Sequence, residues 1–184
     1  MKTVKKIKVN SETIASYLEH LTDSFLFRCA KRYDVKRKKY FEYPSKYYCV
    51  DIGLRNIRLN LRQQEEAHIM ENIIFNELVA RGCSVNVGVI KTEEINNKGI
   101  RSQKTLEIDF VVNRSARKYY IQSALVLPDE GKIKQELRPL LSVKDYFKKI
   151  IITKISMKPW TDDMSVVHLG LYDFLLDENS LDLG

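Results

Sequence analysis

The 184-residue chain is 44% hydrophobic and 30% charged and carries a formal net charge of +7, which is typical of a soluble globular protein with one sizeable core or two small ones. No apolar run approaches the roughly 20 residues that cross a bilayer, and the basic N-terminus leads into no apolar signal region, so we expect a cytoplasmic protein that contacts no membrane. The three cysteines and three histidines are scattered and show no metal-ligand spacing, so we expect neither a metal nor a cofactor.

The positive charge is concentrated at the start of the chain. Residues 1–46 hold 12 Lys and Arg against 5 Asp and Glu, so they carry the whole excess of +7. This asymmetry indicates one basic module rather than a uniformly basic surface. We therefore expect a basic region at 1–46 and a second domain at 47–184.

A helix followed by a hairpin is predicted for the basic region. Asn10 can cap a helix that runs to about Asp23, and its apolar side chains share one face: Ile14, Tyr17, Leu18 and Leu21. The residues from Phe25 to Tyr33 alternate as one strand, with Phe25 and Phe27 on the same face. The turn after this strand carries four consecutive basic residues, Lys36, Arg37, Lys38 and Lys39. One helix with a basic-tipped hairpin resembles the latter half of a winged helix; the alternative is a solvated turn that contacts nothing.

The second domain alternates strands and helices, which is typical of an α/β fold. A long helix is expected at 65–81, ended by Gly82, and a second helix opens at Pro128. Strands are predicted at 47–50, 83–89, 106–112, 118–126, 150–152 and 165–169, with a closing helix at 171–176. The continuous apolar run at 150–152 indicates a strand covered on both faces. The strands at 106–112 and 118–126 should form an antiparallel hairpin at the centre of a mixed sheet, with the 65–81 helix against one face.

The predicted hairpin carries the residues of greatest chemical interest. Leu106, Ile108 and Phe110 should bury one face of the first strand, so that Glu107 and Asp109 project from the other. Glu71 on the long helix and Gln122 on the second strand could then converge with Asp109. Carboxylates that fix Mg²⁺ and its waters would suit phosphodiester hydrolysis. From spacing alone, the alternative is a surface Glu, a strand-face Asp and a hydrogen-bonded Gln.

Several blocks of sequence from Phe25 onward carry a family resemblance. The blocks are Arg32–Lys36, Lys46–Asn56, Glu71–Leu78, Glu107–Phe110, Tyr120–Gln122 and Arg138–Leu141. In these blocks the chain resembles the C-terminal part of prokaryotic AAA-type ATPases, a domain of unknown function that follows their winged helix. The resemblance implies a PD-(D/E)XK nuclease-like core, a mixed sheet flanked by helices, preceded here by a partial winged-helix element.

The resemblance also implies a site that has lost its chemistry. Glu71 matches the helix carboxylate and Asp109 the central metal ligand, but Gln122 stands where the Glu of the Glu-x-Lys element is expected. Ala124 stands where its Lys is expected, and Lys118 or Lys91 would have to substitute for it. No Gly-x-x-x-x-Gly-Lys-Ser/Thr phosphate loop occurs in the chain, so the ATPase module of such proteins is absent from it.

These observations predict a non-catalytic module of an AAA-type ATPase that binds nucleic acid or a protein partner. The alternatives are a metal-dependent nuclease with a migrated active site and a protein-interaction or oligomerisation module. The residues expected to contact nucleic acid are Lys36, Arg37, Lys38 and Lys39 at the hairpin tip. A second cluster of basic residues precedes the first helix: Lys2, Lys5, Lys6 and Lys8.

Overall fold

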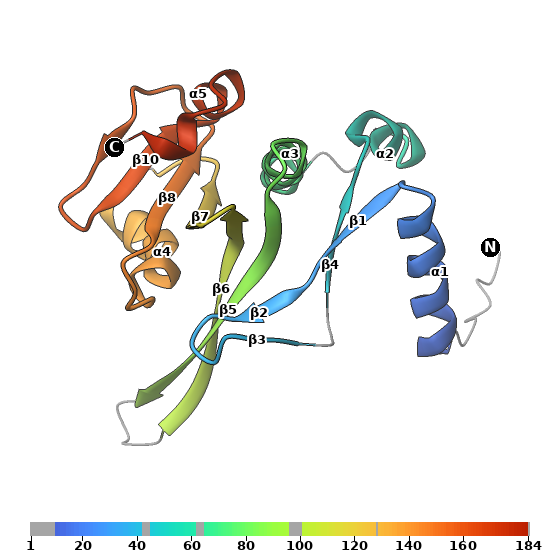
Figure 1. Cartoon of the computed structure of the whole chain (residues 1–184), viewed down its shortest axis with the longest axis horizontal. Coiled ribbons are helices and arrows are strands. Elements are labelled where there is room, and N and C mark those ends of the chain that lie inside the picture. The colour runs from blue at the N-terminus through green and yellow to red at the C-terminus, as the bar shows by residue number, and fades with distance from the viewer. Residues whose placement is uncertain (1–9, 42–44, 62–64, 96–100, 128, 184) are drawn as a thin grey trace, which may run out of the picture.

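The computed structural model describes residues 10–41, 45–61, 65–95, 101–127 and 129–183 and folds them around one large sheet (Figure 1). The helices are α1 (Ser11–Asp23), α2 (Ile52–Arg58), α3 (Glu66–Ala80), α4 (Glu130–Leu141), α5 (Leu171–Leu176) and the 3₁₀ helix η1 (Ser180–Asp182). The strands are β1 (Phe27–Ala30), β2 (Arg32–Asp34), β3 (Lys39–Tyr40), β4 (Lys46–Cys49), β5 (Ser84–Ile95), β6 (Arg101–Arg114), β7 (Arg117–Ala124), β8 (Lys148–Thr153), β9 (Trp160–Thr161) and β10 (Val166–Gly170).

Eight of the described strands form a mixed sheet in the order β3-β2-β5-β6-β7-β8-β10-β9, and β1 and β4 form a separate pair. β6 and β7 are antiparallel because a tight turn joins them, with Ser115 in the left-handed conformation. β7 and β8 are parallel, which requires a crossover, and α4 supplies it. The predicted hairpin is therefore antiparallel and central, and the expected mixed α/β sheet flanked by helices is confirmed.

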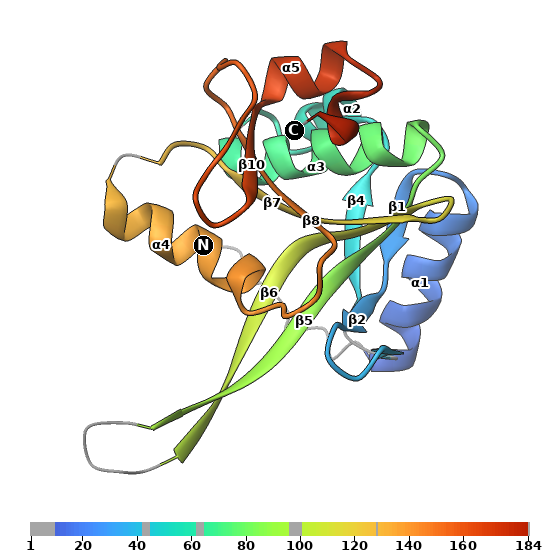
Figure 2. The same cartoon turned by 60° about the vertical axis from the view of Figure 1, so that its left-hand side comes forward.

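Helices cover both faces of this sheet (Figure 2). Side chains of α3 and α5 pack on one face with Phe110 and Ile121, and α4 packs on the other with Ile108 and Tyr120. Neighbouring residues of β8 alternate between the two cores, with Ile150 on the α3 side and Ile151 on the α4 side. The apolar run at 150–152 is thus a strand covered on both faces, as predicted.

A β-bulge in β6 changes which face each residue presents. Asn86 of β5 pairs with Val111 of β6, but Gly88 pairs with Ile108, so β6 holds one extra residue between these pairs. Leu106, Ile108 and Phe110 are all buried, but Phe110 lies in the α3 core whereas the other two lie in the α4 core. The prediction of one shared face is therefore wrong at Phe110, because the bulge interrupts the alternation.

Glycine is required where β5 faces this bulge. A Cβ atom on Gly88 would lie 2.8 Å from Val111 Cγ2 and 3.0 Å from Ile108 Cβ. Real Cβ atoms do not tolerate such approaches to packed branched side chains, so any larger residue would push the two strands apart.

The first 50 residues depart most from prediction. Asn10 caps α1 as expected, accepting a hydrogen bond from Glu12 N, but no residue of α1 is buried. The single strand predicted from Phe25 to Tyr33 is divided: β1 pairs with β4, whereas β2 pairs with β5 in the large sheet. Phe25 precedes β1, has a positive φ and is exposed, so it shares no strand face with Phe27.

The basic hairpin is present but short, since β2 and β3 pair only through Tyr33 with Tyr40 and Asp34 with Lys39. Strands on both sides of the boundary expected at residue 46 pair with one another. The division into separate 1–46 and 47–184 units stays a prediction. Among the described residues, no helix is long and apolar enough to span a membrane.

Candidate functional site

Four charged side chains gather on the α3 side of the sheet. Lys46 comes from β4, Glu71 from α3, and Glu107 and Asp109 from β6. We refer to these four residues as the carboxylate cluster. The structure thus brings together Glu71 and Asp109, keeps Glu107 on the same strand face as Asp109, and adds Lys46, whose role the sequence did not predict.

Asn72 holds β4 against α3 and so places Lys46 in the cluster. Its side-chain oxygen accepts from Cys49 N at 2.9 Å and its amide nitrogen donates to Cys49 O at 2.8 Å. The ring of Tyr48 stacks on Phe75 of α3, with centroids 4.0 Å apart. These backbone and ring contacts fix the strand beside the helix, and the side chain of Lys46 then reaches over the sheet.

The Lys46 ammonium joins two of the acids. Its Nζ lies 2.5 Å from Glu71 Oε1 and 3.2 Å from Glu107 Oε1. Burial alone would lower the pKa of Lys46, but the nearby carboxylates, Glu71 first among them, outweigh burial and raise it. Lys46 is therefore a permanent cation that neutralises acids which would otherwise repel one another.

Two further donors complete the partners of the glutamates. Tyr48 donates its hydroxyl hydrogen to Glu71 Oε1 at 2.6 Å, and burial followed by the charge of Glu71 raises the pKa of this hydroxyl. Arg32 Nη1 donates to Glu107 Oε2 at 2.5 Å. Each glutamate thus has a cation and is held by side chains from the first 50 residues.

Asp109 is the most perturbed acid of the cluster. Its Oδ2 accepts from Ser123 N at 2.8 Å and from Ser123 Oγ at 2.7 Å. Burial, and then repulsion by Glu71, raises the pKa of Asp109 to about 6, although Ser123 and Lys46 act in the opposite direction. The residue keeps some exposed surface, but its carboxylate is held between a neighbouring acid and the sheet. It can therefore exchange a proton near neutral pH.

Gln122 does not join the carboxylates through its side chain. Its Oε1 accepts a long hydrogen bond, 3.4 Å, from the backbone N of Asp109. Its neighbours on the same strand face, Tyr120 and Ala124, belong to the α4 core, so Gln122 and Ala124 point away from α3. Ser123 is the β7 residue that reaches Asp109. A shift of one residue along a strand exchanges its faces. The residue expected beside the Asp109 carboxylate, Gln122, therefore differs by one position from the residue that lies there.

The two lysines suggested as substitutes lie elsewhere. The Nζ of Lys118 lies over the rings of Tyr33 and Phe147, and that of Lys91 lies over Phe41. Lys46 occupies the cluster instead, a residue that sequence reasoning quoted only as part of a tyrosine-rich block. Over the part of the chain that the structure describes, no three His, Cys, Asp or Glu side chains are grouped so that they could hold a metal ion.

The basic hairpin tip is exposed, and one of its cations, Lys36, donates through Nζ to Lys91 O at 3.0 Å. The buried side chain of Asp34 accepts hydrogen bonds from the backbone N–H groups of Lys36 and Arg37, at 3.1 and 2.9 Å, which folds the turn. Lys38 takes the left-handed conformation. All four side chains of residues 36–39 are exposed. We refer to residues 36–39 as the hairpin tip; the predicted cluster at Lys2, Lys5, Lys6 and Lys8 lies outside the described residues.

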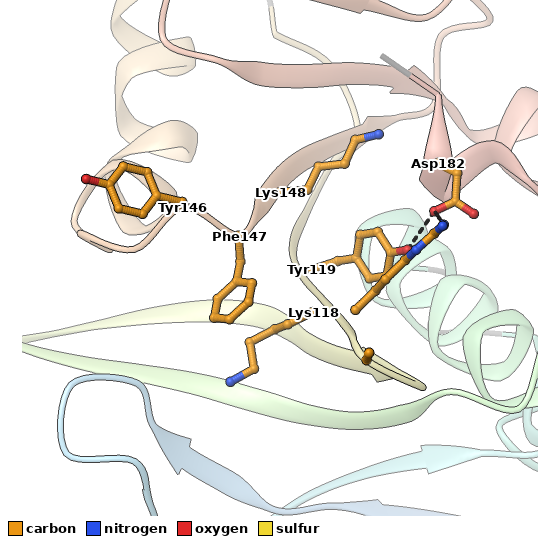
Figure 3. A pocket seen from close by; sticks show the side chains of 8 residues that line it. Lys118, Tyr119, Tyr146, Phe147, Lys148 and Asp182 are labelled. Carbon is orange, nitrogen blue, oxygen red and sulfur yellow. Dashed lines mark hydrogen bonds and ion pairs between the residues drawn. The ribbon is translucent and has the colours of Figure 1, made fainter.

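A second basic surface lies where β7 and β8 begin (Figure 3). It is an open groove of about 480 Å³, lined by Ala116, Arg117, Lys118, Tyr119, Tyr146, Phe147, Lys148 and Asp182. Arg117 is paired with Asp182 at 2.6 Å, and Tyr119 donates to the same carboxylate at 2.7 Å. Sequence reasoning did not predict this groove, because its residues come from three separate segments.

Comparisons with known proteins identify similar sequences of unknown role. A family described as a domain of unknown function, DUF8612, matches residues 1–65, so the match ends between α2 and α3. An uncharacterized protein of Haemophilus influenzae is 34% identical over 175 residues, which are 95% of this chain and 39% of the relative. The chain therefore spans about two-fifths of the length of that curated relative. No solved structure matches the chain. The chain is thus similar to a domain of unknown function and to part of a longer uncharacterized protein.

Proposed function

We propose that this chain is a non-catalytic nucleic-acid-binding module whose nuclease-like carboxylates are offset by a cation of the protein itself, and that it acts as part of a larger AAA-type ATPase. The observation that supports the proposal most is the position of Lys46. Its ammonium lies between Glu71 and Glu107, where a cation is needed to offset the acids. A divalent metal would have to displace it.

The hydrogen bonds that the acids already accept also argue against metal binding. A hard cation such as Mg²⁺ needs charged oxygens with free lone pairs and room for several waters. Asp109 Oδ2 already accepts two hydrogen bonds from Ser123, and its raised pKa of about 6 leaves it partly protonated close to neutral pH. Glu71 Oε1 is shared by Tyr48 and Lys46. One oxygen of Asp109 and one of Glu71 are therefore already occupied by groups of the protein itself.

Nucleic-acid binding is proposed from the hairpin tip. Four adjacent cations on an ordered turn can contact successive phosphates, because such contacts depend on charge and position and need no base recognition. The remainder of the chain beyond residue 46 has no net charge, so the first region should supply most of the attraction. The ATPase partner is proposed from the sequence resemblance together with the greater length of the Haemophilus relative.

The experiment is a salt titration of duplex DNA binding. The parent is compared with a variant in which Lys36, Arg37, Lys38 and Lys39 are changed to Ala. A matched control removes four exposed cations away from the hairpin, Arg58, Lys134, Lys154 and Lys158. For each phosphate that the variant no longer neutralises, the log–log salt slope should become shallower by about 0.9. We expect the tip variant to lose more affinity than the control; equal losses, or no binding by the parent at about 50 mM salt, would contradict the proposal.

One observation favours a second candidate, a metal-dependent nuclease with a migrated lysine. Lys46 lies beside Glu71 and influences Asp109, so it could replace the lysine missing at Ala124 if the acids bound a metal. Cleavage of single- and double-stranded DNA in Mg²⁺ or Mn²⁺ separates the two candidates. Turnover that Asp109→Ala abolishes would support the nuclease. The first proposal predicts no cleavage above background.

A further inference from the structure

The groove at the start of β7 and β8 exposes two consecutive aromatic side chains to solvent. Tyr146 is fully exposed, and Phe147 is exposed over 43% of its surface. Both follow α4 on the segment that leads into β8, and Figure 3 shows Phe147 beside Lys118, with Tyr146 extending away from the sheet. Neighbouring aromatic rings held open to solvent offer flat surfaces to a ligand with rings of its own.

Cations accompany these rings. The Nζ of Lys118 lies 5.1 Å from the centroid of Phe147 and 5.5 Å from that of Tyr33. Lys148 donates to the backbone oxygen of Leu183, and burial lowers its pKa. The salt bridges found among the described residues include Arg117 with Asp182 but involve neither Lys118 nor Lys148. Neither lysine therefore forms a salt bridge among the described residues, although Asp182 lies close enough to act on the charge of Lys148.

The series of rings continues toward the basic hairpin through Tyr33, which is partly buried against the α4 core. Tyr33 of β2 lies 5.2 Å from Tyr40 of β3, measured between ring centroids, and Tyr40 is more than half exposed. Since Lys118 contacts both Tyr33 and Phe147, the rings of the groove and those of the hairpin form one series. We refer to Tyr40, Tyr33, Lys118, Phe147 and Tyr146 as the aromatic row. The row ends next to Lys39, the last residue of the hairpin tip.

We propose that the aromatic row binds single-stranded nucleic acid, with bases stacked on the exposed rings and phosphates held by Lys118 and Lys148. Alternating rings and cations are what unpaired strands require, because each base offers an open face and each phosphate a charge. A duplex keeps its bases stacked inside and can use only the cations. The inference goes beyond the proposed function and does not require the hairpin tip to bind duplex DNA.

The test uses labelled oligonucleotides of about 12 nucleotides, oligo(dT) and oligo(U), together with a duplex of the same length. Tyr146→Ala with Phe147→Ala removes two rings and no charge. The matched control is Tyr172→Ala with Leu176→Ala, two exposed apolar side chains of α5. We expect the row variant to bind single strands at least about fivefold more weakly for each stacked base it loses, with duplex affinity and control unchanged. Comparison of oligo(dT) with oligo(U) shows whether DNA or RNA is preferred.

An abasic strand of equal length separates stacking from charge. The parent should bind it more weakly than oligo(dT), and the row variant should bind it as the parent does. Because Phe147 also lies against Tyr120, Phe147→Leu and Tyr146→Ala are tested singly, so that loss of folding cannot be mistaken for loss of binding. Equal affinity of parent and row variant for oligo(dT), or no binding of either single strand, overturns the proposal. A tip variant that loses duplex binding but keeps oligo(dT) binding would leave it intact.

Discussion

Replacement of Asp109 by Asn tests the electrostatics of the carboxylate cluster. An ordinary aspartate has a pKa of 3.8, and that of Asp109 is raised to about 6, chiefly by burial and by Glu71. A folded-state pKa above the unfolded value means that the folded protein binds the proton more tightly, so stability is lost as pH rises from about 4 to 6. The full shift corresponds to about 3 kcal/mol of destabilisation above pH 6.

Asparagine carries no titrating group and can still accept hydrogen bonds from Ser123. The Asn variant should therefore lose this pH dependence. Its weaker hydrogen bonds lower the unfolding free energy by an amount that does not change with pH. Relative to the parent, the variant should gain about 2 kcal/mol of unfolding free energy between pH 4.5 and pH 8. For a chain of this size, that gain is a shift of roughly 4–8 °C in relative Tm.

The assay is urea or thermal unfolding of parent and variant at several pH values and one ionic strength. Asp163→Asn serves as the control, because it removes an exposed carboxylate outside the cluster. A difference between parent and Asp109→Asn that is the same at pH 4.5 and pH 8 would refute the reasoning. A parent that gains stability from millimolar Mg²⁺, with that gain lost in the variant, would instead support metal binding.

Three other substitutions should affect stability in ways that follow from the same region. Lys46→Met leaves two partly buried glutamates without their shared cation and should cost about 2–3 kcal/mol in urea unfolding at pH 7, whereas Lys46→Arg should retain most of the stability. Gly88→Ala forces a Cβ against two branched side chains and should lower the unfolding free energy by about 1–3 kcal/mol. Ser123→Ala removes one hydrogen-bond donor to Asp109 and should lower the unfolding free energy by about 1–2 kcal/mol. It should also raise the pKa of Asp109 further, which an NMR titration of the carboxyl group would measure.

The sequence was sufficient for elements whose signal is local. Asn10 caps α1, Gly82 ends α3 in the left-handed conformation, and the apolar run at 150–152 is a strand covered on both faces. A polar turn between two alternating segments was enough to predict the central β6–β7 hairpin. Each of these features depends on residues that are close together in the sequence, and those residues have a strong preference for the conformation or burial in question.

The features that the sequence did not disclose depend on distant partners. The bulge in β6 arises from its pairing with β5 at Gly88, and it alone moves Phe110 to the α3 core. Lys46 meets Glu107 across 61 residues of chain, and nothing near Lys46 marks it as a counterion. The strand expected from Phe25 to Tyr33 is divided because its two halves pair with different strands. The alternation of apolar residues does not identify the strand with which each half pairs.

The counterion explains how the acids of the cluster are tolerated without a lysine on β7. Two carboxylates as close as Glu71 and Asp109 destabilise a fold unless a cation or a proton offsets them. Lys46 supplies the cation from β4, and the pKa of Asp109, raised to about 6, lets that carboxylate take up a proton in mildly acidic solution. On β7 it is Ser123 that donates to the Asp109 carboxylate, whereas the side chain of Gln122 accepts only from the Asp109 backbone. The hairpin tip and the aromatic row, where we propose that nucleic acid binds, share no residue with the cluster.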